Sequence, residues 1–229
     1  MSTIPKQQNI AGYWKGNLNQ SGTLQDFSGN ANHMTLVSAP PQVETPYGSA
    51  LDYDGTNDYC KVADNTSLSI TGDLTISTWL NTDNRAGDEK ILTKWISGNT
   101  QNSYLFKFDA GKVLFFTPDS LTDGGNNFER TDSAILFDGI WHHITVVYDA
   151  SVPKVIFYLD GRIQTSTTTG TIQGSLPNGT AETRIGSIDG SGGDYEGRYT
   201  QTILWNTALN PNDARQLYLA MQRLTAKRL

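Results

Sequence analysis

The sequence predicts an all-β protein, and three of its properties point to that class. The 229 residues are 37% hydrophobic and only 17% charged, and they include 22 glycines, a composition typical of many short strands joined by turns. Apolar and polar residues alternate with period two in several segments. Turn-forming dipeptides such as Asp-Gly separate those segments. Because all-β sandwiches of this length are routinely one domain, we expect a single antiparallel sandwich of two sheets.

The segment 141–162 is expected to form the centre of the fold. β-Branched and aromatic residues fill 141–148 in alternation, and apolar residues alternate again over 155–159. A turn around Pro153 joins these two strands, and Asp160-Gly161 then supplies the positive φ values of a tight hairpin corner. The segment therefore predicts an antiparallel meander.

Shorter strands are expected around the meander. The same alternation places two of them within 48–62, on either side of a turn, and the others at residues 68–81, 91–96, 103–109 and 112–117. The first two flank a tight turn at 54–57. Residues 119–132 have no clear period and form the longest candidate surface loop, which makes them a natural place for recognition.

The two ends of the chain differ from the middle. Residues 1–10 are polar, contain Pro5 and have no period, so we expect an arm that is disordered or docked on a neighbour. Asn210 precedes Pro211, which places a capping residue before the residue type favoured at the first helical position. Apolar residues then recur at helical spacing at Ala214, Leu217, Tyr218, Met221 and Leu224, among basic Arg223, Lys227 and Arg228. Residues 210–229 therefore predict a short amphipathic helix with a basic tail.

Charge and cysteine content narrow the class of partner. A net charge of −6 and a pI near 4.9 argue against a nucleic-acid-binding protein, which must neutralise phosphates. Cys60 is the single cysteine, and its alternating flanks favour a buried structural thiol over a catalytic one. The sequence contains no apolar run of signal-peptide or membrane-span length, so we expect synthesis in the cytoplasm without a signal peptide and no membrane insertion.

A series of motifs along the chain resembles one known family. They are Trp14, Asp26-Phe-Ser-Gly-Asn30, Gly48-Ser-Ala-Leu-Asp-Tyr-Asp-Gly-Thr-Asn-Asp-Tyr59, Leu74-Thr-Ile-Ser-Thr-Trp79, Asp138-Gly-Ile-Trp-His-His-Ile-Thr-Val-Val-Tyr148, Tyr158-Leu-Asp-Gly161, Arg184-Ile-Gly186 and Leu204-Trp-Asn-Thr-Ala-Leu209. In this order they resemble a laminin-G-like domain of the concanavalin A-like lectin/glucanase superfamily, from about Ala11 to Tyr218. The resemblance implies two curved antiparallel sheets packed as a jelly roll over 11–209. It also implies binding of glycans or proteins, frequently with a calcium ion.

Two loops rich in side-chain oxygens are candidate calcium sites. Asp26 lies in one and Asp54 in the other, and such oxygens either bind a hard cation or cap the loop's own backbone. The family commonly has Gly-x-Ile-Asp-Glu-Val before the last strand, whereas this chain has Thr200 and Gln201 at the acidic positions. Because calcium affinity depends on carboxylate charge, this departure weakens the calcium prediction.

Ligand-binding residues are expected in or beside loops. There, exposed aromatic rings would stack on sugars, and amide or guanidinium groups would satisfy sugar hydroxyls. The candidates are Trp95, Tyr104, Asn126, Asn127, Arg130, Tyr195 and Arg198. A structural role is the alternative for each of them.

The sequence lacks the signs of an enzyme. Glycoside hydrolysis needs two facing carboxyl groups, and the Glu-x-Asp-x-x-Glu run typical of jelly-roll hydrolases is absent. Asp194 and Glu196 are better explained as part of a solvated loop. His142 and His143 are adjacent on a predicted strand, so they point to opposite faces and at most one faces the core. Fingerprints for nucleophilic, phosphoryl or hydride chemistry are missing too, which predicts a non-enzymatic protein.

Two functional hypotheses fit these features. The first is a free-standing lectin-like protein whose loops bind a glycan. The second is a surface or attachment protein of a virus or phage particle, which binds glycans or neighbouring virion subunits. Family domains usually face the outside of a cell, whereas this sequence starts with Met and has no export signal, so we expect the virion-surface version. A glycoside hydrolase is a lesser alternative, and a homo-oligomer is left open.

Overall fold

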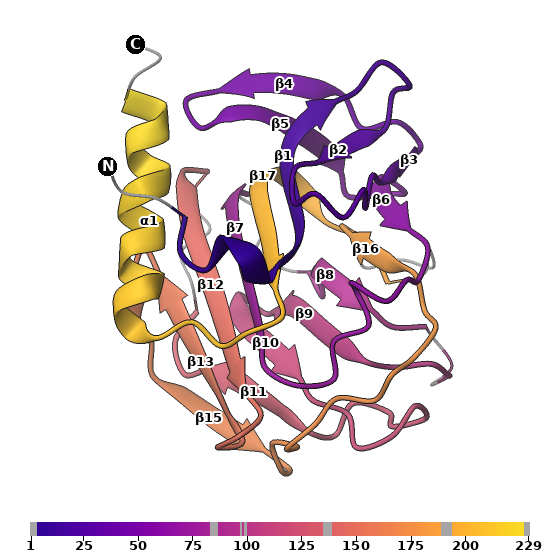
Figure 1. Cartoon of the computed structure of the whole chain (residues 1–229), viewed down its shortest axis with the longest axis vertical. Helices are drawn as coiled ribbons and strands as arrows, with labels where there is room; N and C mark the ends of the chain where they lie inside the picture. Colours follow the sequence, from indigo (N-terminus) through magenta and orange to yellow (C-terminus); the bar gives the residue numbers. More distant parts are fainter. Residues whose placement is uncertain are drawn as a thin grey trace.

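A computed structural model describes residues 4–82, 87–96, 98, 100–134, 139–188 and 194–226, with the side chains of 223–226 left aside. Two antiparallel sheets pack face to face, and one C-terminal helix lies against the outside of the first sheet (Figure 1). This confirms the predicted all-β jelly-roll sandwich with a short C-terminal helix.

The first sheet, sheet A, is organised around the strand β17 (Glu196–Trp205). Its strands run in the order β14-β13-β12-β7-β17-β1-β2, and β5 pairs with β17 and with β4. Their bounds are β1 Ile10–Leu18, β2 Leu24–Asp26, β4 Gln42–Thr45, β5 Gly48–Asp54, β7 Leu74–Asn81, β12 Trp141–Asp149, β13 Lys154–Leu159 and β14 Arg162–Ile163. The predicted meander of β12, β13 and β14 is confirmed as one side of this sheet.

The second sheet, sheet B, has the order β15-β11-β10-β9-β8-β16-β6-β3. The bounds are β3 Thr35–Val37, β6 Tyr59–Val62, β8 Lys90–Lys94, β9 Tyr104–Asp109, β10 Lys112–Phe116, β11 Phe128–Thr131, β15 Ser166–Thr169 and β16 Thr183–Ile185. The strands expected on either side of the turn 54–57 are present, and they belong to different sheets. One expectation needs correction: the expected loop 119–132 contains β11, which forms because β10 and β15 pair with its two edges.

The core lies between the sheets and is built by strand alternation. Ile144, Val146 and Tyr148 of β12 face this inner core, and each is fully buried. Val147 of the same strand points outward, where it packs in a second apolar cluster with Trp79 of β7. Because both faces of sheet A are covered at β12, this strand is buried along nearly its whole length.

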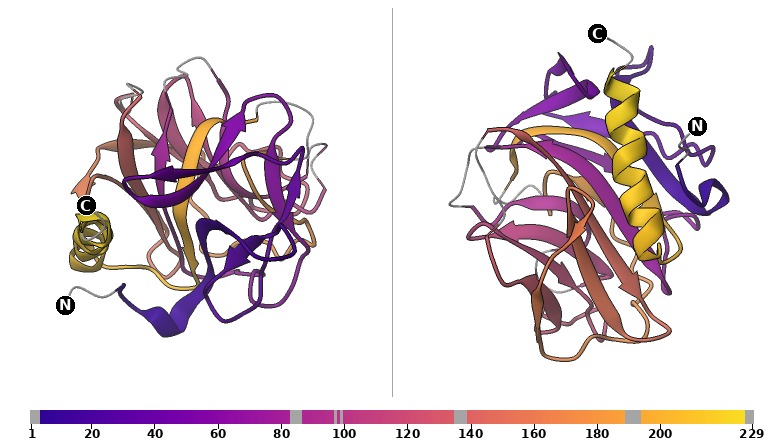
Figure 2. Two further views of the ribbon diagram at one scale, coloured as in Figure 1. Left: turned by 90° about the horizontal axis from the view of Figure 1, so that it is seen from above. Right: turned by 90° about the vertical axis from the view of Figure 1, so that its left-hand side faces the viewer.

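Helix α1 (Pro211–Ala226) covers the outer face of sheet A (Figure 2). The Asn210 side chain accepts a hydrogen bond from the backbone N–H of Asp213 at 2.9 Å, which confirms the predicted N-cap. Leu217 and Met221 are buried against Trp205 and its neighbours. Among the described residues, no helix is long and apolar enough to cross a membrane. The side chains of Arg223, Leu224, Lys227 and Arg228 lie outside the described residues.

The described part of the N-terminal arm packs on its own domain. A short 3-10 helix, η1 (Gln7–Asn9), leads into β1, and Ile4 packs against the cluster under α1. The indole N–H of Trp205 donates to the carbonyl oxygen of Pro5 at 3.2 Å. From residue 4 onward the arm is therefore ordered on its own domain rather than disordered, and docking on a neighbour stays a prediction.

Candidate ligand-binding site

A bulge in the central strand β17 interrupts the regular alternation of side chains between the two faces of sheet A at Gln201. The pairing of β17 with β7 shifts register between Thr200 and Ile203, and Gln201 between them has a φ of +53°. A left-handed backbone at a residue other than glycine costs on the order of 1–3 kcal/mol and is concentrated at functional sites. Bulges also redirect side chains, so Gln201 marks this part of sheet A as a candidate site.

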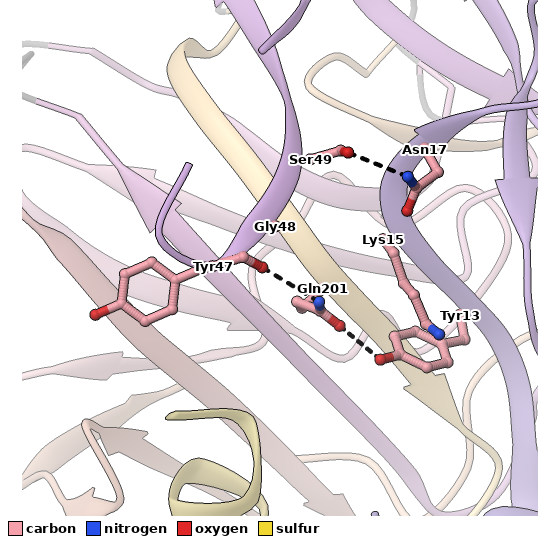
Figure 3. Close-up of a pocket in the computed structure, with 7 residues that line it drawn as sticks. All are labelled: Tyr13, Lys15, Asn17, Tyr47, Gly48, Ser49 and Gln201. Atoms are coloured by element: carbon pink, nitrogen blue, oxygen red, sulfur yellow. Dashed lines mark hydrogen bonds between the residues drawn. The ribbon is translucent and has the colours of Figure 1, made fainter. Parts of the chain in front are cut away.

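Two hydrogen bonds hold the Gln201 amide. The phenol of Tyr13 donates to Gln201 Oε1 at 2.5 Å, and Gln201 Nε2 donates to the carbonyl oxygen of Tyr47 at 3.3 Å (Figure 3). Burial raises the pKa of Tyr13, so its hydroxyl keeps the proton that it donates. The amide is therefore fixed in one orientation, with its oxygen toward β1 and its nitrogen toward the β4–β5 turn.

The Gln201 amide opens into a small polar pocket, which we call the Gln201 pocket. Its volume is about 200 Å³, and β1, β17, the β4–β5 turn and the start of β5 supply its lining, namely Tyr13, Lys15, Asn17, Tyr47, Gly48, Ser49 and Gln201 (Figure 3). Asn17 Nδ2 donates to Ser49 Oγ at 3.1 Å, and the Ser49 hydroxyl donates to Glu44 at 2.7 Å. The pocket walls are thus tied together by side-chain hydrogen bonds.

Lys15 brings a positive charge to the edge of the Gln201 pocket. Its ammonium lies 4.2 Å from the ring centre of Phe27 and 4.8 Å from that of Tyr13. A cation over an aromatic face within about 6 Å is attracted by the ring quadrupole. Phe27 is 40% exposed, so a large apolar surface borders the pocket beside this charge.

Thr200 joins the two strands that form the pocket walls. Its hydroxyl oxygen lies 3.0 Å from the carbonyl oxygen of Lys15 and 2.6 Å from that of Ser49. A neutral hydroxyl can donate its proton to these carbonyls, whereas a carboxylate at the same place would face two negative oxygens. Thr200 and Gln201 differ from the acidic residues common in the family. Both neutral side chains donate hydrogen bonds to backbone carbonyl oxygens that line the pocket.

The candidate calcium ligands have other partners. Asp26 is 6% exposed and accepts hydrogen bonds from the backbone N–H groups of Tyr13, Ser28 and Asn32 and from the Ser28 hydroxyl, at 2.6–2.9 Å. Asp54 caps the backbone N–H of Thr56 at 2.9 Å. Within the described ranges, no three His, Cys, Asp or Glu side chains are grouped to hold a metal ion. Asp26 thus organises its own loop through these hydrogen bonds, and calcium binding at Asp26 or Asp54 stays a prediction.

Three predicted aromatic ligand residues are not exposed. Tyr104 on β9 and Tyr195 are both 0% exposed and belong to the inner core. Trp95 is 5% exposed and packs edge-to-face with Phe116, under the backbone of Gly125. The expectation that these three rings are free to stack on a sugar is wrong, because sequence position beside a loop does not exclude burial by the opposite sheet or by the loop itself.

The four polar candidates lie apart from the Gln201 pocket. Asn127 bridges its loop, donating to Asp123 at 3.1 Å and accepting from the backbone of Thr171 at 2.9 Å, and Asn126 precedes it. Arg130 is exposed on β11, and Arg198 pairs with Asp52 at 3.1 Å on β17. None of the four lines the Gln201 pocket. Their role in ligand binding stays a prediction.

Sequence reasoning missed most of the pocket. Tyr13, Lys15, Asn17 and Ser49 come from strands whose alternation gives no hint of a shared cavity. Gln201 could have been singled out from the sequence, because it stands at a position that is commonly acidic in the family.

Asp194, His142 and His143 are buried, whereas Glu196 is exposed. Asp194 is only 4% exposed, so the expectation of a solvated loop there is wrong. His142 and His143 do point to opposite faces, yet both are buried, and His143 lies against Tyr218 of α1 on the outer face. His142 Nδ1 lies 2.8 Å from Asp160, and His143 Nε2 lies 2.7 Å from the Ser77 hydroxyl. Burial lowers the pKa of His143 to about 3, so its imidazole is neutral.

The fold is that of concanavalin A-like domains, a jelly-roll sandwich, and it carries a polar pocket on its strands. The sequence agrees with this class, because residues 54–215 match the family model of the laminin G type, described as the concanavalin A-like lectin/glucanases superfamily. This segment is more than half of the chain, and the chain belongs to that superfamily.

Known proteins with this fold include receptor-binding domains of toxins. The binding domain of Paraclostridial Mosquitocidal Protein 1 superposes with a TM-score of 0.72 at 16% identity, over 93% of this chain and 52% of that one. The binding domain of botulinum neurotoxin DC, solved in complex with rat synaptotagmin II, gives 0.66 at 12% identity, over 96% and 52%. The same domain solved with SialylT gives 0.65 at 12%, over 94% and 52%. These likenesses establish the fold, and this chain spans about half of each toxin domain.

One curated relative shares part of the sequence. The rat protein "Sushi, von Willebrand factor type A, EGF and pentraxin domain-containing protein 1" is 24% identical over 181 residues, which are 76% of this chain and 5% of that protein. The chain therefore corresponds to one small part of a much longer molecule.

Proposed function

We propose that this chain is a non-enzymatic recognition domain that binds a sugar of a glycan receptor in the Gln201 pocket. The observation that carries the proposal is the strained bulge of β17, which holds the Gln201 amide in the pocket at a cost in backbone energy. Strain of this kind persists where a side chain must be held in one place. The similarity to toxin binding domains supports a receptor-binding role at the level of the fold.

The chemistry of the pocket suits one sugar ring. Amide, hydroxyl and ammonium groups of Gln201, Asn17, Ser49 and Lys15 provide donors and acceptors for sugar hydroxyls. Drug-sized ligands occupy pockets of about 300–1,000 Å³, so a pocket of about 200 Å³ is sized for a single ring. The exposed Phe27 at its border offers an apolar surface for the C–H face of a neighbouring ring.

The same lining argues against hydrolysis. Glycoside hydrolases place two carboxyl groups on either side of the scissile bond. The seven residues that line the Gln201 pocket include no carboxylate, histidine or cysteine. We therefore propose binding without turnover. The proposal does not require calcium, and the test below is therefore run with and without it.

A glycan array with and without calcium tests the proposal, followed by titration of the best ligand into two variants. We expect Gln201→Ala and Lys15→Met to weaken binding at least about tenfold, since each removes a polar contact. Lys154→Met, which removes an exposed lysine on β13, is the matched control and should leave the affinity unchanged. An array without any signal under either condition would overturn the function. Unchanged affinity in both pocket variants would overturn the site.

The virion-surface role and the free-standing lectin are two settings for this same binding activity. Mass analysis of purified particles separates them, because a virion protein is recovered with the particle and a free lectin is not. The virion-surface role stays a prediction from the sequence, as does assembly into a homo-oligomer.

A further inference from the structure

A second pocket lies where the N-terminal arm meets the rest of the domain. It has a volume of about 320 Å³ and is formed by η1 and the start of β1, by the connection between β6 and β7, and by the connection between β17 and α1. Its lining comprises Gln8, Ile10, Ala11, Asn30, Thr66, Ser67, Ser69, Ile70, Thr71, Gly72, Asp73 and Asn206. We call it the Thr71 pocket, and it shares no lining residue with the Gln201 pocket.

Hydrogen bonds fix the arm side of the Thr71 pocket. The backbone N–H of Asn206 donates to the carbonyl oxygen of Asn9 at 3.0 Å, and Asn9 Nδ2 donates to the Asn206 side-chain oxygen at 3.1 Å. Figure 1 shows η1 beside the connection from β17 to α1, in agreement with these contacts. Asn30 Nδ2 donates to the carbonyl oxygens of Ile10 and Ala11 at 3.0 and 3.1 Å. This wall is therefore formed before a ligand arrives.

The opposite wall, residues 65–73, is fixed in the same way. Asn65 Oδ1 accepts from the backbone N–H and the hydroxyl of Ser67, at 3.0 and 2.6 Å. Leu68 is fully buried in the inner core, and the carbonyl oxygen of Thr71 accepts from the backbone of Leu176 at 2.8 Å. A preformed pocket avoids much of the ordering cost of binding.

The polar groups of the Thr71 pocket are nearly all neutral. Its amides and hydroxyls come from seven Gln, Asn, Ser and Thr residues, and its lining contains no lysine, arginine or histidine. The one carboxylate is Asp73, which accepts the backbone N–H of Ala150 at 2.9 Å. Such a lining gives a neutral ligand many donors and acceptors, and it gives an anion no countercharge.

Some polar groups of the Thr71 pocket are open to a ligand. The hydroxyls of Thr66 and Thr71 and the amide of Gln8 belong to exposed side chains and make no hydrogen bond to the described part of the chain. Ile10 and Ile70 also line the cavity and add apolar groups. Exposed hydroxyls and amides beside aliphatic side chains match the two kinds of surface on a pyranose ring, its hydroxyls and its C–H groups.

We propose that the Thr71 pocket is a second carbohydrate site, which takes a neutral sugar ring. The proposal rests on the proposed glycan-binding function, but it concerns a different pocket, whose lining lacks a cation such as Lys15 of the Gln201 pocket. At about 320 Å³ it falls at the small end of ligand pockets, a size suited to one ring with a substituent. Two sites on one domain would let a branched glycan bind through both, so that the second contact forms at high effective concentration.

Backbone amide NMR with single sugars tests the proposal on the whole chain. The probes are glucose, galactose, N-acetylglucosamine and N-acetylgalactosamine, with glucuronic acid as the charged counterpart of glucose. We expect at least one neutral sugar to shift the amide signals of residues 66–73 and Asn206, and glucuronic acid to shift them less than glucose. If no neutral sugar moves these signals, or if glucuronic acid moves them as strongly, the proposal is overturned.

Variants separate this site from the Gln201 pocket. Thr66→Val together with Thr71→Val keeps the side-chain shape and removes two hydroxyls, so the dissociation constant at this site should rise about tenfold. Thr169→Val, which removes an exposed hydroxyl on β15, is the matched control. Gln201→Ala should leave the response of residues 66–73 intact. Loss of that response in Gln201→Ala, or full binding by the double valine variant, would assign the signal to the Gln201 pocket and refute a second site.

Discussion

At the scale of single residues, Thr200 and Gln201 of β17 stand where the family commonly has two acidic residues. Their neutral side chains form hydrogen bonds instead. Thr200 contacts the carbonyl oxygens of Lys15 and Ser49, and Gln201 joins Tyr13 to the β4–β5 turn. Both sets of contacts link strands that would otherwise present unpaired oxygens to each other. The pair thus holds the pocket walls together through neutral side-chain hydrogen bonds.

Thr200→Asp should make the stability of the domain depend on calcium. A carboxylate beside two carbonyl oxygens lacks a donor, so we expect a loss of about 1–3 kcal/mol in chelator. Calcium should recover much of this loss, because carboxylate and carbonyl oxygens are the ligands it prefers. Thermal unfolding in chelator and in calcium measures the effect. Thr200→Val is the control, which should lose stability equally in both buffers. A Thr200→Asp variant insensitive to calcium would contradict this account.

Glu89 is a buried carboxylic acid whose stability contribution depends on pH. Its side chain is only 3% exposed. Burial raises its pKa from 4.5 to about 7, and the nearby charge of Glu196 adds to the rise while the backbone N–H of Glu196 opposes it. A folded-state pKa above the unfolded one means that its contribution is full below about pH 4.5 and is lost as the pH rises through 7.

Glu89→Gln should therefore stabilise the protein at pH 8 and have little effect at pH 4. We expect a gain of about 2 kcal/mol at the higher pH, because the amide mimics the protonated acid. Urea unfolding across this pH range provides the measurement, with the exposed Asp119→Asn as control. A gain of equal size at both pH values would show that the charge of Glu89 is not the cause.

At the scale of elements, helix α1 and strand β12 depend on each other. The outward-facing residues of β12 are buried because α1 covers them, and α1 buries one face because the sheet is there. Leu217 is fully buried at this contact, whereas Leu219, two positions on, is 37% exposed. Substitutions at Leu217 and Leu219 can therefore separate the stability that comes from packing α1 on the sheet from the stability that comes from intrinsic helix propensity.

Leu217→Ala should cost about 2–5 kcal/mol, as for other buried leucines that leave a cavity. Leu219→Ala has the same effect on intrinsic helix propensity but removes a side chain that is partly in water. Its cost should be below about 1 kcal/mol. Chemical denaturation of both variants compares them. Equal losses would mean that α1 is not held by the apolar contact described above.

Period-two alternation predicted β7, β9, β10, β12 and β13 closely, because one or both faces of those strands are apolar. It could not assign strands to sheets. The turn at 54–57 has the sequence of a hairpin, yet its two strands separate because β17 pairs with β5 and β16 pairs with β6. Likewise β11 has no clear alternation and exists because its neighbours supply hydrogen bonds.

At the scale of the whole molecule, the resemblance of the sequence to laminin-G-like domains predicted the jelly roll, and the fold confirms it. The positions of the two candidate pockets were not predicted from the sequence. Ligand residues were expected in loops, where the chain is exposed, but the two pockets also draw on strands and on short connections pinned by hydrogen bonds. Cavities of this kind form from segments far apart in sequence, so their lining cannot be read from local pattern alone.

The stacking of Tyr47 on Trp79 gives the domain a built-in optical reporter. The two rings lie 4.0 Å apart, and the carbonyl oxygen of Tyr47 accepts the hydrogen bond from the Gln201 amide. Any ligand that displaces this amide pulls on the residue whose ring covers Trp79. The emission of one indole is thereby connected to the state of the Gln201 pocket, so occupancy could be followed by intrinsic fluorescence without a label.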